Sequence, residues 1–164
     1  MVRAIEGAGY SVEEMGIALD VAATEFHTEE GYHMDGKVLS SDELVDVYSG
    51  WLDDYPILSI EDGFDEDDWR GWATFTKREG HRVQSVGDDL FVTQSERLAQ
   101  GIELGAANAM LVKLNQVGTV TETLEAMDLA TSNGYNNVIS HRSGETEDVT
   151  IADLAVGTRA GQIK

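Results

Sequence analysis

Charged side chains in this sequence stand directly after short apolar runs, and their types suggest a site for a metal ion and an anion. They are Asp20, Glu61, Asp88, Lys113 and the pair His141-Arg142. Three carboxylates brought together would repel one another and raise each other's pKa, so a cation is needed among them. Hard oxygen ligands that leave room for water favour Mg²⁺. We therefore predict a magnesium site; the alternative is that each carboxylate caps a helix or pairs with Lys or Arg.

The run 140–148, with the sequence SHRSGETED, places an imidazole, a guanidinium and two hydroxyls within four residues. Arg142 can offer two parallel donors to a phosphate group. His141 could also be an ordinary loop histidine with local partners. Because Lys113, Arg142 and Lys164 are three of only 11 basic residues, we predict an anionic substrate at this end of the chain.

The apolar runs that precede these groups are short and do not alternate, which is typical of strands buried on both faces of a parallel sheet. They cover residues 17–19, 57–60, 83–86, 110–112 and 138–139. Helix start signals lie between them: Ser40 with Glu43, Thr93 with Glu96, and Thr119 with Glu122 each fit a capping box. Strand and helix in alternation predict an α/β fold, either an open doubly wound sheet or a (β/α) barrel. In the barrel, the polar groups would meet at the C-terminal mouth.

The segment 24–37 is rich in Glu, His and Gly and shows no clear period. We expect an irregular surface excursion between the first strand and its helix. Its histidines, His27 and His33, are predicted to be solvated loop residues rather than metal ligands, because no set of partners with ligand spacing surrounds them.

Composition limits the classes of function. A chain of 164 residues with 41% hydrophobic side chains can bury the core of one folded domain. The 31 acidic and 11 basic residues give a net charge of −20, which repels nucleic acid. Such a surface is typical of proteins that stay soluble in concentrated salt, although it could also dock a basic partner.

Cysteine usage and hydropathy bound the chain further. The absence of cysteine excludes disulfides and thiolate metal sites. No apolar run approaches the roughly 18 residues of a membrane span, and the N-terminus lacks the layout of a signal peptide. We therefore expect a cytoplasmic protein.

Several segments resemble enolase, the glycolytic phosphopyruvate hydratase, and occur in enolase order. They are residues 18–26, 59–69, 86–90 with 92–93, 113–119 and 140–148, with 161–164 at the end. The resemblance implies that Asp20, Glu61 and Asp88 are magnesium ligands, the latter two also beside the substrate, and that Lys113 is the general base. It further implies that His141, Arg142, Ser143 and Lys164 contact the substrate. Asp62 and Asp89, adjacent to ligands, would support them.

The same resemblance implies a partial (β/α)8 TIM-type barrel, roughly strands three to eight with their helices. Residues 1–164 would then be a fragment of the enolase C-terminal barrel domain, without the N-terminal domain, the first two barrel strands and the glutamate that acts as general acid. The implied activity is the Mg²⁺-dependent reversible dehydration of 2-phospho-D-glycerate to phosphoenolpyruvate in glycolysis and gluconeogenesis, by a protein that forms a homodimer when full length.

Two alternatives to this activity stay open at the level of sequence. One is a lyase or racemase of the wider superfamily with another substrate, against which the run 140–148 argues. The other is a non-catalytic truncated enolase paralogue that serves as a binding or scaffold module. Because the resemblance leaves the general acid unmatched, we expect the isolated 164-residue chain to bind Mg²⁺ weakly and to form little phosphoenolpyruvate.

Overall fold

A five-stranded parallel sheet forms the centre of the structure, which is a computed structural model that describes residues 1–144 and 146–164. Its strands are β1 (Ile17–Asp20), β5 (Ile57–Glu61), β6 (Gln84–Gly87), β7 (Ala109–Val112) and β8 (Asn136–Ile139), in that spatial order. Each predicted strand lies within two residues of an observed one. Ile163 adds a parallel bridge to Ile139 and marks a sixth strand position. Glu145, within the run 140–148, lies outside the described residues.

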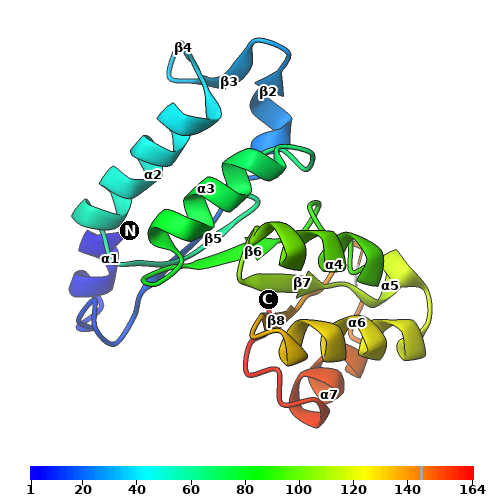
Figure 1. Cartoon of the computed structure of the whole chain (residues 1–164). Coiled ribbons are helices and arrows are strands. Elements are labelled where there is room, and N and C mark those ends of the chain that lie inside the picture. The colour runs from blue at the N-terminus through cyan, green and yellow to red at the C-terminus, as the bar shows by residue number, and fades with distance from the viewer. Residues whose placement is uncertain (145) are drawn as a thin grey trace.

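Helices alternate with these strands and cover one side of the sheet (Figure 1). The four that pack along it are α2 (Ser41–Asp54), α3 (Trp69–Glu79), α4 (Ser95–Leu104) and α6 (Val120–Ser132). Shorter helices are α1 (Val2–Gly7), α5 (Leu114–Val117) and α7 (Thr150–Gly157). A parallel sheet with its crossover helices on one side curves into the wall of a barrel, so the predicted partial (β/α) barrel is confirmed.

The sheet has two buried faces, and alternation along β7 shows which residues belong to each. Met110 and Val112 join the large core beneath the helices. Ala109 and Leu111 point the other way and form a small second cluster with Val86 and Val138. That second cluster is the inner wall of the partial barrel, and the strand ends above it carry the predicted site.

One of the three predicted capping boxes forms in full, and a second forms in part. Ser40 and Glu43 cap α2 reciprocally, and the Thr119 side chain accepts from the backbone N–H of Glu122 at the start of α6. The third, at Thr93, was wrong, because the N-cap of α4 is Gln94. A capping residue needs extended backbone, whereas Thr93 has a φ of 57°. Its hydroxyl turns toward β7 instead.

The segment 24–37 lies between β1 and α2 as expected, but the prediction that it is irregular was wrong. It holds a 3-10 helix η1 (Ala23–Phe26) and an antiparallel sheet of β2 (His27–Thr28), β3 (Gly31–Met34) and β4 (Lys37–Leu39). Tyr32 anchors this small sheet, since its ring is buried and its hydroxyl donates to Asp68 Oδ2 at 2.7 Å. Both histidines have local partners: His27 Nδ1 lies 3.2 Å from Asp65 Oδ2, and His33 Nε2 lies 2.9 Å from Thr28 Oγ1.

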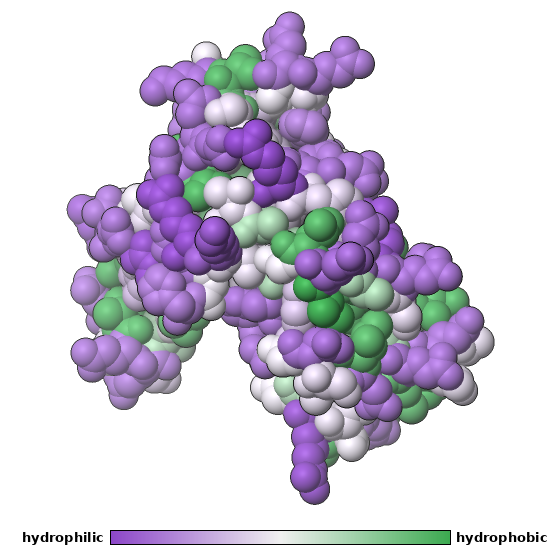
Figure 2. Space-filling model, viewed as in Figure 1, coloured by the Kyte–Doolittle hydropathy of each residue, from purple (hydrophilic) through white to green (hydrophobic). Residues whose placement is uncertain are grey.

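Hydrophilic residues cover most of the face shown in Figure 2, and the apolar residues form separate patches between them. This agrees with a net charge of −20 spread over the chain. Within residues 1–144 and 146–164, no helix combines the length and the apolar character that crossing a bilayer would need.

Candidate metal and anion site

The C-terminal ends of β1, β5 and β6 bring the predicted metal ligands to one edge of the sheet. Asp20 and Glu61 are direct partners in the β1–β5 register. Glu61 in turn pairs with Val86 of β6, and Asp88 follows two residues later. Because the strands are parallel and in register, three carboxylates distant in sequence come to the same edge of the sheet.

Two lysines neutralise these carboxylates. Lys164 Nζ donates to Asp20 Oδ2 at 2.6 Å and to Glu61 Oε1 at 2.7 Å. Lys113 Nζ, from the end of β7, donates to Asp88 Oδ2. The structure thus places the predicted base and one predicted substrate contact directly on the predicted ligand set.

Burial dominates the electrostatics of this edge. The side chain of Glu61 is only 9% exposed, and burial raises its pKa although the hydrogen bond from Lys164 acts in the opposite direction. Burial alone would lower the pKa of Lys164, but its hydrogen bonds to Asp20 and Glu61 raise it above the ordinary value. The pair therefore keeps a buried carboxylate beside a firmly protonated amine.

A second acidic group adjoins the first and shares Asp88 with it. Asp62, Asp88 and Asp89 each offer a carboxylate oxygen, and these atoms lie within 4.8 Å of one another. Asp62 supports the other two, since its Oδ1 accepts from the Asp88 N–H at 2.8 Å and its Oδ2 from the Asp89 N–H at 3.0 Å. Burial raises the pKa of Asp62 to about 7, against the effect of those two N–H groups.

One atom at this edge is left unsatisfied among the described residues. Asp88 Oδ1 is buried and has no hydrogen-bond partner. An unpaired buried acceptor is costly, and each such atom in a folded protein calls for an explanation. A hard divalent cation would satisfy it, and the candidate ligand atoms of Asp62, Asp88 and Asp89 are all carboxylate oxygens, which suit Mg²⁺. The residues present therefore fit a magnesium ion.

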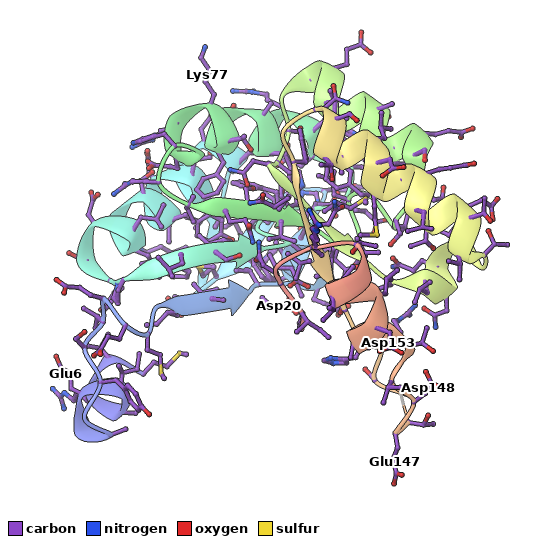
Figure 3. The ribbon with its side chains drawn as sticks, turned by 90° about the horizontal axis from the view of Figure 1, so that it is seen from below. Glu6, Asp20, Lys77, Glu147, Asp148 and Asp153 are labelled. Atoms are coloured by element: carbon purple, nitrogen blue, oxygen red, sulfur yellow. The ribbon has the colours of Figure 1, made fainter. Side chains whose placement is uncertain are left out.

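A cavity of about 650 Å³ opens at these strand ends along the inner wall of the barrel. Asp20, Glu61 and Lys164 form its charged part, while Val86 and Val138 belong to its apolar floor. Figure 3 shows Asp20 at the end of β1, where the first strand reaches this edge.

The loop after β8 supplies the predicted anion contacts, and it is exposed. His141, Arg142 and Ser143 all face solvent. Arg142 Nη1 donates to Asn115 Oδ1 at 3.0 Å, and the His141 backbone N–H donates to the Lys164 carbonyl at 3.1 Å. Arg142 and Ser143 line a neighbouring cavity of about 570 Å³ together with Asn115. A guanidinium at the open rim of a site is placed to meet an incoming anion.

Comparison with known protein families shows which family the chain belongs to. The family described as enolase, C-terminal TIM barrel domain, matches the chain over residues 1–164. The chain belongs to the enolase family. The parallel sheet with its helices is accordingly a portion of the enolase barrel, and the acidic edge lies at the C-terminal ends of its strands, where barrel enzymes keep their sites.

Within this enolase barrel, the described residues at the acidic end of the run 140–148 are exposed. Figure 3 shows Glu147 projecting outward from the loop after β8. Thr146 and Asp148 line the same cavity as Arg142 and Ser143, beside Asn115. The loop therefore brings a carboxylate as well as a guanidinium to the edge of this cavity.

Sequence reasoning missed two polar residues that contact the predicted enolase site. Thr93 was interpreted as a helix cap, but its hydroxyl accepts from the Lys113 backbone N–H at 2.9 Å. Asn115 was noted only as part of the segment 113–119, although it accepts from Arg142. Their position just after strands was a usable signal, because loops at that edge of a barrel lie next to one another.

Proposed function

We propose that this chain carries the site that reversibly dehydrates 2-phospho-D-glycerate to phosphoenolpyruvate, with Mg²⁺ as cofactor. Lys113 acts as general base, and Asp20, Glu61 and Asp88 hold the metal. The substrate meets Glu61, Asp88, His141, Arg142, Ser143 and Lys164. The observation that carries the proposal is the set of contacts from Lys164 and Lys113 to these three carboxylates at one sheet edge.

The reaction begins with removal of the proton on C2, next to the substrate carboxylate. Lys113 in its neutral form accepts that proton, and the electron pair of the C–H bond spreads into the carboxylate. Bound Mg²⁺ would supply positive charge opposite this developing negative charge; the enolase superfamily is the established example of a Lys or His base working with such ions. The C3–O bond would then break and the hydroxyl would leave as water, a step that needs a proton from a general acid to which the resemblance matches no residue of this sequence.

The burial of Lys113 supports its role as the base. The Lys113 side chain is 15% exposed and that of Asp88 12% exposed, so both are largely withdrawn from water. The neutral Lys113 that this step requires would hold Asp88 less tightly than the ammonium form does, which would leave that carboxylate available to the metal.

The anion side complements a phosphate. Arg142 presents a guanidinium fork at the rim, and Ser143 adds a hydroxyl beside it. In a chain of charge −20, a cationic rim is needed to hold a phosphate ester near an acidic pocket. We infer from the glycolytic role a cytoplasmic protein, and a homodimer in the full-length form.

Hydrogen exchange at C2 of the substrate tests this function most directly. The chain is incubated with Mg²⁺ and 2-phosphoglycerate in D₂O, and loss of the C2 proton signal is followed by NMR. This step needs the base and the metal but not the group that protonates the leaving hydroxyl. We expect exchange that depends on Mg²⁺ and that Lys113→Met slows by roughly 10²- to 10⁴-fold.

Lys77→Met is the matched control. Lys77 lies on α3 and points outward from the helix layer (Figure 3), so its loss should leave the exchange rate within about twofold of the parent chain. Equal exchange by the Lys113 and Lys77 variants would contradict the assignment of the base. No exchange at any Mg²⁺ concentration would contradict the proposed function.

A further inference from the structure

The loop between β6 and α4 contains two adjacent β-branched residues in the left-handed region of backbone space. Val92 has a φ of 44° and Thr93 a φ of 57°. Side chains branched at Cβ avoid this region, and such conformations persist only where the surrounding structure imposes them, often at functional sites. Thr93 is 0% exposed. Helix capping does not explain the conformation, because α4 begins after Gln94.

This conformation directs the Thr93 hydroxyl toward the end of the next strand, β7. It accepts a hydrogen bond from the Lys113 backbone N–H at 2.9 Å. Its own proton faces two acceptors on either side of Lys113, Leu111 O at 3.3 Å and Gln116 Oε1 at 3.0 Å. One buried hydroxyl therefore ties together the end of β7 and the start of α5.

The same loop also holds the other end of the Lys113 side chain. Asp88, which opens the loop after β6, accepts from Lys113 Nζ. Thr93 fixes the backbone from which the side chain departs, and Asp88 fixes the amine in which it ends. Two contacts from one short loop thus leave this long, flexible side chain little freedom.

Neighbouring loops repeat this relation. Asp62, after β5, accepts from the backbone N–H groups of Asp88 and Asp89 after β6. Asn115, after β7, accepts from Arg142 after β8. The segments after β5, β6 and β7 therefore each hold residues at the end of the following strand by a side-chain hydrogen bond.

We propose that Thr93 is a positioning residue for Lys113. The proposal rests on the proposed function of Lys113 as general base and adds the residue that sets its direction. The strained turn at residues 92–93 serves to place the Thr93 hydroxyl, and that hydroxyl holds Lys113 so that its amine points at the carboxylate edge.

Three substitutions at Thr93 test this. Thr93→Val keeps the shape and the branched Cβ but removes the hydroxyl. Thr93→Ser keeps the hydroxyl. Thr93→Gly removes the hydroxyl and suits the left-handed backbone, so it provides a hydroxyl-free chain should the Val variant fail to fold.

Thr123→Val is the control for loss of a buried hydroxyl elsewhere. Thr123 is also 0% exposed, and its hydroxyl donates to the Thr119 carbonyl at 2.8 Å within the helical region of α6. This variant reports what a lost buried hydrogen bond does to melting temperature alone, away from the candidate site.

Two measurements are made on each variant with the whole chain. The first is hydrogen exchange of the Lys113 backbone amide by NMR, compared with that of Val112. The second is C2 exchange of 2-phosphoglycerate with Mg²⁺. In Thr93→Val and Thr93→Gly we expect amide exchange to become faster at Lys113 than at Val112, and the factor of acceleration at Lys113 should be at least ten times that at Val112. We also expect the maximal rate of C2 exchange to fall at least tenfold with less than a twofold change in half-saturating substrate.

Rescue decides between positioning and mere stability. Thr93→Ser should restore both readouts to within threefold of the parent chain, and Thr123→Val should change neither, even if its melting temperature falls as far. If Thr93→Val lowers only the melting temperature and leaves both readouts unchanged, the positioning role is overturned. If the parent chain exchanges no C2 proton, the base role of Lys113 fails, while the amide measurement still decides whether Thr93 holds Lys113.

Discussion

Two buried carboxylates in this barrel are treated in opposite ways. Glu79, at the end of α3, is 4% exposed and has both oxygens engaged: Oε1 accepts from Ser49 Oγ at 2.6 Å and Oε2 from Arg82 Nε at 2.6 Å. Asp88 is 8% exposed, and among the described residues only its Oδ2 has a hydrogen-bond partner, Lys113. The fold can satisfy a buried acid fully and does so away from the site.

The neighbour of Asp88 also differs from Glu79 in its electrostatics. The hydrogen bond from Arg82 holds the pKa of Glu79 below its usual value, whereas burial raises the pKa of Asp62 to about 7. Asp88 lies in a group with Asp62 and Asp89, and among the described residues that group has one lysine paired with it, Lys113. Three carboxylates with one lysine lack positive charge, and we infer that they are arranged for a ligand that supplies it.

The largest effect that would sharpen this contrast is on C2 exchange. Asp88→Asn should lower the Mg²⁺-dependent exchange rate by about 10²-fold or more, because it removes a ligand and the partner of the base. Glu79→Gln should leave the rate within about twofold at a temperature where both chains are folded. NMR of 2-phosphoglycerate in D₂O measures both, and similar losses in the two variants would erase the distinction.

Mg²⁺ itself should stabilise the folded chain by binding to the carboxylates around Asp88. A ligand that binds only the native state adds about 2.7 kcal/mol to the free energy of unfolding at 100 times its dissociation constant. We expect urea unfolding with Mg²⁺ to show a gain that grows with concentration, disappears with EDTA and is lost in Asp88→Asn. Glu79→Gln should keep the whole gain; its loss there would mean that Mg²⁺ acts elsewhere.

The ion pair of Glu79 with Arg82 predicts a pH dependence of the free energy of unfolding. The native pKa of Glu79 lies below the value of about 4.5 that applies when unfolded, so the unfolded state binds more protons in that window. The contribution is therefore whole above pH 4.5 and is lost as the pH falls through the native pKa. Glu79→Gln should cost roughly 1–3 kcal/mol at pH 7 and much less near pH 3, as measured by urea unfolding.

Asp46→Asn controls for ion pairing at the surface. Asp46 accepts from Arg78 at 2.6 Å, but its side chain is 68% exposed. Exposed pairs contribute little, so its loss should cost less than about 1 kcal/mol at either pH. An equal cost for Asp46→Asn and Glu79→Gln would show that burial does not set the strength of these pairs.

The smallest effect concerns the exposed charges that belong neither to the Glu79 ion pair nor to the carboxylates around Asp88. With a net charge of −20, the exposed carboxylates repel one another. At 0.1 M salt this repulsion is largely screened between charges more than about 10 Å apart. We expect the melting temperature to rise by a few degrees between low and molar KCl, equivalent to roughly 1 kcal/mol for a chain of this size. A fall over that range would contradict this reasoning.

The strand ends and their charged groups could be predicted from the sequence because they depend on short-range patterns. An apolar run followed by a polar residue identifies the end of a buried strand, and parallel strands share an edge. Asp20, Glu61 and Lys113 are therefore found at that edge as expected. Their metal and base roles stay proposals, because no distance alone assigns a reaction.

Thr93 shows what the local pattern could not predict. Thr93 and Glu96 fit a capping box as well as Ser40 and Glu43 do, yet only Ser40 has the extended backbone that a cap requires. The left-handed turn at Thr93 is imposed by contacts with β7, which are distant in sequence. The prediction for the segment 24–37 was wrong for a related reason. Its strands are two to four residues long, which is too short to show an alternation of apolar and polar residues.

The ion pairs of Lys164 also bear on the order of folding. Its amine meets Asp20 across 144 residues and Glu61 across 103, whereas Glu79 meets Arg82 across three. Loop closure over long separations costs more chain entropy, and distant contacts slow folding. Helix α3 and its ion pair can form early and locally, while the acidic edge assembles only after the first and last strands have met. A folding intermediate with native helices would therefore still lack the binding edge.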